Sequence, residues 1–201
     1  RYTYFGHSCF LVETSGCRLL FDPFITPNPL AAAIDITSIE ADVILISHGH
    51  FDHVMDAAKI QRRHGCRVGF HPDTAVMVGD GSFFKKHGFD IEFEPVTADR
   101  LIEEGAVAGV GGFEMSVLHV PGHCPGSLCF YFPELKTLVG GDVLFREGVG
   151  RWDLPSGDGP LLFEGIRTKI FPLPEETIVL PGHGPATTVG HERTSNPFVA
   201  E

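Results

Sequence analysis

The chain has 201 residues and a net charge of −11, from 26 acidic and 15 basic residues. This length fits one large domain or two small ones, and the 43% of hydrophobic residues is enough for a buried core. No lysine- or arginine-rich cluster stands out, which argues against a nucleic-acid-binding protein. No apolar run reaches about 18 residues, so the sequence predicts no membrane-spanning helix.

Cysteine usage indicates where the chain works. There are five cysteines, an odd number, and no CxxC pair. A chain that builds its own core does not need a disulfide framework, so we expect small buried thiols and a cytoplasmic, reducing setting.

The first half of the chain alternates apolar runs with helical patterns. The residues 42–47 form a nearly unbroken apolar run that ends at a histidine, which is typical of a buried strand. The expected elements are strands at 9–14, 18–24, 42–47 and 66–70, and helices at 53–64 and 73–87, the second broken at Gly79–Gly81.

The second half is richer in strands. We expect mostly strands from about 91 to 141, with a hairpin of 127–132 and 136–141. A helix is expected at 158–170. An apolar strand then runs into the glycine-rich loop of "TIVLPGHG".

Two stretches of the chain resemble each other. Residues 6–24 and 122–145 each open with Gly-His, pass through a strand, a polar turn and a second strand, and end at or just after an aspartate. Each half later has another apolar strand that runs to a histidine. We interpret this as an internal duplication, with halves of about 1–90 and 91–201 in a single domain of residues 1–201. Equivalent strand ends would then meet at one edge.

The stretch "ISHGHFDHVMD" holds three histidines and two aspartates in eleven positions. His48 and His50 are two apart in a loop that leaves a strand, so both imidazoles can point to one side. Asp52 and His53 then begin a helix. These four side chains are as many ligands as one tetrahedral zinc uses.

Further candidate ligands follow other predicted strands. With these, the chain has five histidines and two carboxylates at predicted strand ends: His48, His50, Asp52, His53, His123, Asp142 and His183. That set suits two metal ions, one held by His48, His50 and His123, the other by Asp52, His53 and His183, with Asp142 bridging both. Two Zn2+ ions are favoured by the histidine-rich set, and iron or manganese also accepts such ligands.

The charge of such a centre indicates hydrolysis. Two divalent cations and two carboxylates leave about +2, which lowers the pKa of a water toward about 7 and polarises a carbonyl or phosphoryl oxygen. A hydroxide between the ions would be the nucleophile, and no serine or cysteine nucleophile is needed.

Other polar residues lie near these motifs. His7 and Asp22 are the duplication counterparts of two candidate ligands. They either support the metal edge, Asp22 by accepting a hydrogen bond from a ligand histidine or by bracing the loop that carries it, or are plain turn residues. Arg151 either faces the substrate or pairs with Asp153 or Glu147.

The motifs "HGHFDH", "PGHCPGS", "GGDVLF" and "PGHGP" resemble the successive signatures of the metallo-β-lactamase superfamily, from about residue 1 to 198. The resemblance implies an α/β fold, a four-layer αβ/βα sandwich, with a dinuclear metal site along one edge. It implies the seven ligands named above, with Asp52 and Asp142 as the carboxylates of the catalytic centre.

Different parts of the chain resemble different branches. Residues 112–198 look most like small glyoxalase II-like hydrolases, which implies thioester hydrolysis. Only 18 residues follow His183, so we do not expect the helical domain that holds glutathione in the classical enzymes. The N-terminal third looks more like a branch of metal-dependent hydrolases that includes sugar-phosphate lactonases.

The leading hypothesis is therefore a dinuclear-metal-dependent hydrolase of a small-molecule thioester or ester, with no nucleic-acid or membrane partner. One alternative is a mononuclear iron persulfide dioxygenase on the same fold. Another is a lactonase or phosphodiesterase.

Overall fold

The computed structural model describes residues 1–13, 16–110 and 113–200. The chain divides into two compact units, Arg1–Ile102 and Glu103–Glu201, hereafter unit 1 and unit 2. The sequence placed the boundary about a dozen residues earlier. That both halves make one domain stays a prediction. Thr14, the last residue of the first predicted strand, lies outside the described residues.

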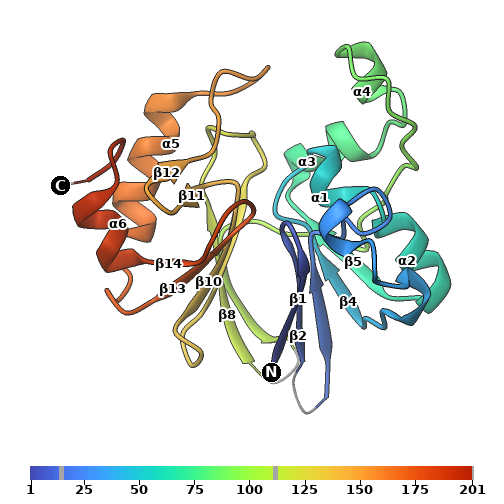
Figure 1. Ribbon diagram of the computed structural model, residues 1–201, viewed down its shortest axis with the longest axis horizontal. Coiled ribbons are helices and arrows are strands. Elements are labelled where there is room, and N and C mark those ends of the chain that lie inside the picture. Colours follow the sequence, from blue (N-terminus) through green and yellow to red (C-terminus); the bar gives the residue numbers. More distant parts are fainter. Residues whose placement is uncertain (14–15, 111–112, 201) are drawn as a thin grey trace. The chain divides into compact units, whose positions relative to one another are not determined.

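Unit 1 is a sheet with helices on one face (Figure 1). Its strands, in sheet order, are β1 (Tyr2–Gly6), β2 (Cys9–Glu13), β3 (Arg18–Phe21), β4 (Val43–Leu45), β5 (Arg67–Phe70) and β6 (Arg100–Leu101). Its helices are α1 (Phe51–Val54), α2 (Ala57–His64), α3 (Pro72–Val78) and α4 (Phe83–Lys86), with 3-10 turns at Pro29–Ala31 and Ile36–Ser38. β1 to β3 are antiparallel, and β3 to β6 are parallel.

Unit 2 repeats the central part of this order. Its sheet is β14 (Thr187–Thr188), β13 (Ile178–Pro181), β10 (Thr137–Gly141), β9 (Leu128–Phe132), β8 (Phe113–His119) and β7 (Gly105–Val110). A separate hairpin joins β11 (Leu144–Phe145) to β12 (Gly148–Val149). The helices of unit 2 are α5 (Gly159–Gly165), which continues into the π-helical segment Ile166–Ile170, and α6 (Val189–Ser195), which follows β14. β8, β9 and β10 are antiparallel and β10 pairs with β13 in parallel, which is the order that an internal duplication predicts.

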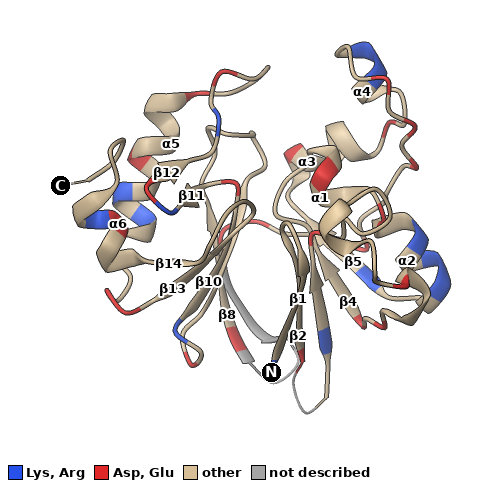
Figure 2. Cartoon of the chain, viewed as in Figure 1, with Lys and Arg blue, Asp and Glu red and all other residues tan. Residues whose placement is uncertain are grey.

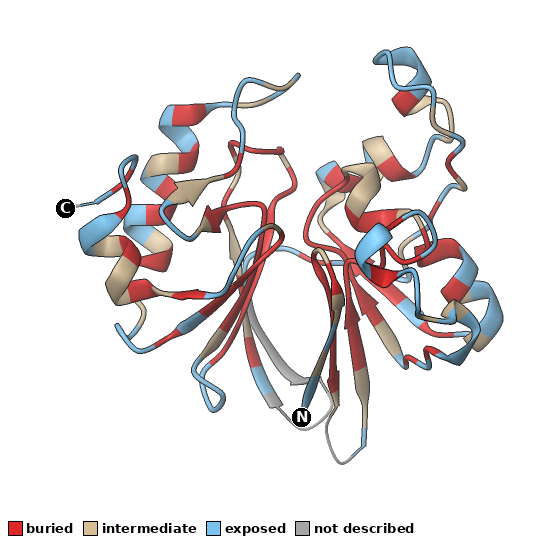
Figure 3. Ribbon diagram, in the orientation of Figure 1, coloured by how far each residue is buried: buried red, intermediate tan, exposed pale blue. Residues whose placement is uncertain are grey.

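Each unit has its own apolar core between sheet and helices. Figure 3 shows the central strands of both sheets buried along most of their length. In unit 1, Leu20 of β3 and Ile44 of β4 pack with Ile60 of α2, and each is at most 1% exposed. In unit 2, Leu138 of β10 packs in a cluster with Leu162 of α5. These cores hold the ends of the parallel strands in place.

The helix expected at 53–64 is two helices. α1 ends at Val54 and α2 begins at Ala57, because Asp56 between them turns its carboxylate to the loop after β3. It accepts hydrogen bonds from the backbone N–H groups of Ile25 (2.8 Å) and Thr26 (2.7 Å). A local helical pattern does not reveal a partner thirty residues away. The predicted break at Gly79–Gly81 is confirmed, since α3 and α4 flank it.

The strands expected from residue 91 begin only at β6. Residues 91–99 form no strand, and they bury Phe93 and Val96 against the core of unit 1 as an extended loop. Pro95 has no N–H to donate to a sheet, and the Val96 N–H donates to Val78 at the end of α3. The helix expected at 158–170 is confirmed as α5 and the π-helical segment.

Charge on the surface is mixed. Figure 2 shows lysine and arginine gathering on α2, but Lys59 lies 3.0 Å from Asp56 and Arg62 pairs with Glu94. The basic groups of this helix are thus largely neutralised locally. No helix in the described residues is long and apolar enough to cross a membrane.

The Asp56 carboxylate is expected to make unit 1 pH-sensitive. Although burial raises its pKa, the hydrogen bonds from Thr26 and Ile25 outweigh this and hold the pKa below the ordinary aspartate value. Because the folded-state pKa is depressed, the stabilisation is present above about pH 4 and is lost as the pH falls below it. Asp56→Ala should lower the free energy of unfolding at pH 7 by about 2–4 kcal/mol.

Urea unfolding of the metal-free chain at pH 7 and at pH 3.5 measures this effect. The difference between Asp56→Ala and the parent should be smaller at the lower pH. The exposed Asp90 provides the control, since Asp90→Ala should change stability at neither pH. An equal difference at both pH values would show that the carboxylate charge does not contribute.

Candidate metal centre

The polar residues of unit 1 follow two neighbouring parallel strands. Phe21 of β3 pairs with Leu45 of β4, so Asp22 and Ser47 emerge at the same edge of the sheet. Asp22 is 0% exposed and accepts from the Ser47 N–H (2.7 Å) and from the Ser47 hydroxyl (2.6 Å). Its φ of 43° is in the left-handed region, which aspartate tolerates better than most residues. This pair fixes the start of the histidine-rich loop.

The same pair sets the tautomers of two histidines. A carboxylate oxygen only accepts, so the contact of 2.9 Å between His53 Nδ1 and Asp22 Oδ2 is an Nδ1–H donation. The Ser47 hydroxyl already donates to Asp22, so its oxygen accepts from His48 Nδ1 at 3.1 Å. Both imidazoles therefore present the lone pair of Nε2, which is the form that binds a metal.

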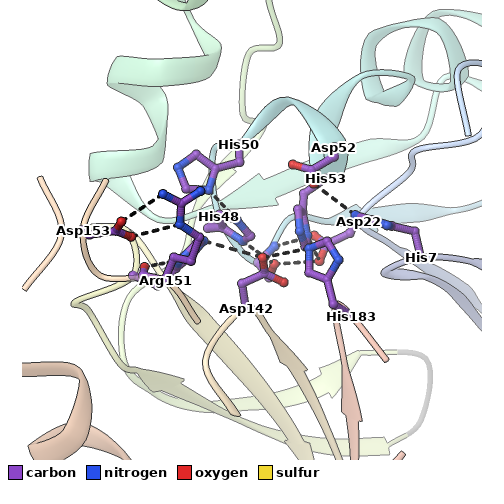
Figure 4. A network of polar contacts seen from close by, with 12 residues as sticks. His7, Asp22, His48, His50, Asp52, His53, Asp142, Arg151, Asp153 and His183 are labelled. Atoms are coloured by element: carbon purple, nitrogen blue, oxygen red, sulfur yellow. Dashed lines mark hydrogen bonds and ion pairs between the residues drawn. The ribbon is translucent and has the colours of Figure 1, made fainter. Parts of the chain in front are cut away.

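The other two candidate ligands of the loop lie beside them (Figure 4). His50 Nδ1 is 3.1 Å from His48 Nε2. Two nitrogens bound to one tetrahedral zinc are about 3.3 Å apart, so this separation suits a shared ion. Asp52 accepts from His7 Nε2 at 3.1 Å, and one ligand atom each of His7, Asp52 and His53 lie within 4.8 Å of one another.

Unit 2 brings its three candidate ligands together by itself. His123 and Asp142 are almost fully buried, while His183, in the glycine-rich loop after β13, has a side chain that is 41% exposed. Asp142 Oδ2 lies 3.6 Å from His123 Nε2 and 3.1 Å from His183 Nε2. One carboxylate oxygen thus faces two imidazole nitrogens, a donor set that suits a divalent cation.

A backbone carbonyl orients His123. His123 Nδ1 donates to the carbonyl oxygen of Arg151 at 2.7 Å, because a carbonyl only accepts. The Nε2 lone pair of His123 therefore faces Asp142. The sequence does not reveal this contact, because the two residues are 28 positions apart and the acceptor is a backbone carbonyl.

The Arg151 side chain turns to Asp153. Two nitrogens of its guanidinium each lie 2.9 Å from an Asp153 oxygen, and these bonds raise the pKa of Arg151. Glu147, the other expected partner, lies 3.1 Å from His191. Of the two ion pairs that the sequence indicated, the pair with Asp153 is the one formed.

A model of the metallo-beta-lactamase superfamily matches residues 2–183. The chain belongs to this superfamily. The match spans both units, including all seven candidate ligands, and confirms the resemblance that the four motifs indicated.

Relatives of this superfamily member cover nearly its whole length. It is 33% identical over 200 residues to the hydroxyacylglutathione hydrolase GloC of Haemophilus influenzae, covering 98% of this chain and 94% of that protein. It is 34% identical to the probable metallo-hydrolase YqgX of Bacillus subtilis, covering 96% and 92%. This chain is accordingly a metal-dependent hydrolase.

Solved structures confirm the fold class. The superfamily member matches the BLEG-1 B3 metallo-beta-lactamase with a TM-score of 0.84 at 33% identity, over 96% of this chain and 94% of that one. It matches TTHA1623 in a di-iron-bound form with a TM-score of 0.79 at 39% identity, over 94% and 93%. The α/β metallo-β-lactamase fold is thus established, and one of these relatives binds two iron ions.

Proposed function

We propose that the candidate ligands of both units together hold two divalent metal ions and that the chain hydrolyses a small-molecule thioester or ester. The observation that carries this is the common tautomer of His48, His53 and His123, each of which donates Nδ1–H to an acceptor and presents the Nε2 lone pair. Three histidines arranged alike, in both units, suit metal ligation better than any use as surface polar groups.

The donor set fits the ions. Five imidazoles and two carboxylates match two Zn2+ ions, and iron or manganese also accepts these ligands. In this proposal His48, His50 and His123 would hold one ion, and Asp52, His53 and His183 would hold the other. The approach of Asp142 to both His123 and His183 supports a role for its carboxylate toward both ions.

Two bound divalent ions would lower the pKa of a water and polarise the carbonyl oxygen of the substrate. The residues of the chain orient the ligands and set the charge. Asp52 and Asp142 bring two negative charges to two dications, which leaves about +2 and favours an anionic nucleophile near pH 7. Asp22 keeps the proton of His53 on Nδ1, and the Arg151 carbonyl does the same for His123.

The substrate class follows from the relatives and the motifs. A thioester is favoured because GloC is named a hydroxyacylglutathione hydrolase and covers 98% of this chain.

The five cysteines, all within the described residues, are thiols, which supports the cytoplasmic setting proposed from the sequence.

Metal analysis together with a substrate panel tests the proposal. We expect two metal ions per chain, and a higher kcat/KM for a glutathione thioester than for a lactone, a phosphodiester or a β-lactam. One iron per chain with oxygen uptake on a glutathione persulfide would contradict it and identify a dioxygenase. Faster turnover of any other panel member would assign the substrate to that class.

A further inference from the structure

Among its described residues, unit 2 buries one carboxylate that is not a candidate ligand. Glu192 of α6 is 0% exposed. Its oxygens accept hydrogen bonds from the Thr187 hydroxyl, from the Glu147 backbone N–H (2.9 Å) and from the Asn196 side-chain amide (2.8 Å). A carboxylate in an apolar interior is unfavourable unless such donors surround it, so these three contacts account for an acid at this position.

Two of these contacts hold the β11–β12 hairpin against α6. Glu147 lies in the hairpin turn with a φ of 55°, in the left-handed region, and its N–H points to Glu192. Asn196, one helical turn beyond Glu192, also donates to the Gly148 carbonyl at 2.9 Å. The helix therefore fixes the turn at two consecutive residues.

The hairpin lies between two parts of the candidate metal centre. Its first strand, β11, begins two residues after Asp142, and its second strand, β12, ends two residues before Arg151. After the hairpin, the backbone at Gly150 lies against Asp142, so close that a Cβ on residue 150 would be 1.9 Å from the Asp142 carbonyl oxygen. The Gly150 N–H donates to the Val143 carbonyl at 3.3 Å. The next carbonyl, of Arg151, then accepts from His123 Nδ1.

We propose that Glu192 is a positioning residue for the metal centre: by holding the hairpin it places the Arg151 carbonyl that orients the His123 imidazole. This inference rests on the proposed function, since it takes His123 as a ligand. The contacts run in four steps. Glu192 accepts from the Glu147 N–H, and the β11–β12 pairing continues to Gly150, which lies close to Asp142. The Arg151 carbonyl then accepts from His123.

Two substitutions at Glu192 separate positioning from charge. Glu192→Ala removes all three acceptor contacts. Glu192→Gln retains an oxygen for the Glu147 and Asn196 donors, while its amide faces the Thr187 hydroxyl, which can rotate and accept. The control is Leu138→Ala in β10, which weakens the same apolar core of unit 2 but leaves the hydrogen bonds of Glu192 in place.

The measurement is the affinity of the full chain for Co2+, by competition with a chromophoric chelator. We expect Glu192→Ala to bind at least one Co2+ about 10-fold more weakly. Glu192→Gln should bind as the parent does, and Leu138→Ala should lower the unfolding midpoint without changing the affinity. If Glu192→Ala does not fold, Glu192→Asp replaces it, since the shorter side chain withdraws the oxygens from the Glu147 N–H.

A second readout keeps this inference separate from the proposed function. In the metal-free chain, 15N NMR should show the proton of His123 on Nδ1 in the parent and in Glu192→Gln, and a mixture of tautomers in Glu192→Ala. Parental affinity and parental tautomer in Glu192→Ala would overturn the inference, as would an equal loss of affinity in Leu138→Ala. A parent that binds no Co2+ would refute the proposed function alone, and the NMR result would still decide the role of Glu192.

Discussion

Asp142→Ala is expected to abolish two-metal binding and to lower kcat/KM by about 10³-fold or more. Asp142 is 7% exposed and faces the two candidate ligand histidines of unit 2, at 3.6 Å from His123 and 3.1 Å from His183. Without it, two nearby cations would repel each other with no carboxylate between them. The variant should therefore lose bound metal while it remains folded.

Metal content per chain and steady-state turnover of a glutathione thioester measure this effect. Asp142→Asn separates shape from charge, because the amide keeps the volume and removes the negative charge. The control is Asp153→Ala, which removes an exposed partner of Arg151 and should leave metal content unchanged. Parental turnover by Asp142→Ala would contradict the dinuclear proposal.

Asp22→Asn is expected to weaken metal binding by about 10- to 100-fold while the fold is retained. Asparagine tolerates the φ of 43° at this position, and its Oδ1 can accept from the Ser47 N–H as the carboxylate does. Its amide nitrogen would then face His53 Nδ1 as a donor. His53 would have to accept there and to carry its proton on Nε2, the atom proposed to bind the metal.

Zn2+ affinity by competition, together with 15N NMR of His53, measures this change of tautomer. Asp35→Asn is the matched control, because Asp35 also accepts a backbone N–H in unit 1, from Thr37, but at an exposed turn. It should bind Zn2+ as the parent does. Unchanged Zn2+ affinity in Asp22→Asn would mean that the proton position on His53 does not control metal binding.

The order of elements and the candidate ligands could be predicted from the sequence. Apolar strands such as β4 and β13 are followed by His48 and His183, and a ligand at the end of a buried strand is visible in a local pattern. The metallo-β-lactamase fold was also predicted, because four motifs of that superfamily follow one another along the chain.

The sequence alone was wrong where a polar side chain or a backbone group had a distant partner. The helix expected at 53–64 is broken at Asp56, whose carboxylate bonds to Thr26, 30 residues away. The strand expected after residue 91 is a loop, although its buried residues have the apolar character of a strand. Hydrophobic periodicity indicates which residues are buried, but not which backbone groups pair.

The proton positions were decided only by the tertiary structure. Asp22 and His53 are 31 residues apart, His123 and Arg151 are 28 apart, and Glu147 and Glu192 are 45 apart. Such contacts leave no local pattern, and two of them involve a backbone group that is the same in every residue. The sequence by itself thus determined which side chains are candidate ligands. Folding decided which nitrogen each histidine presents, because that depends on where an acceptor lies in space.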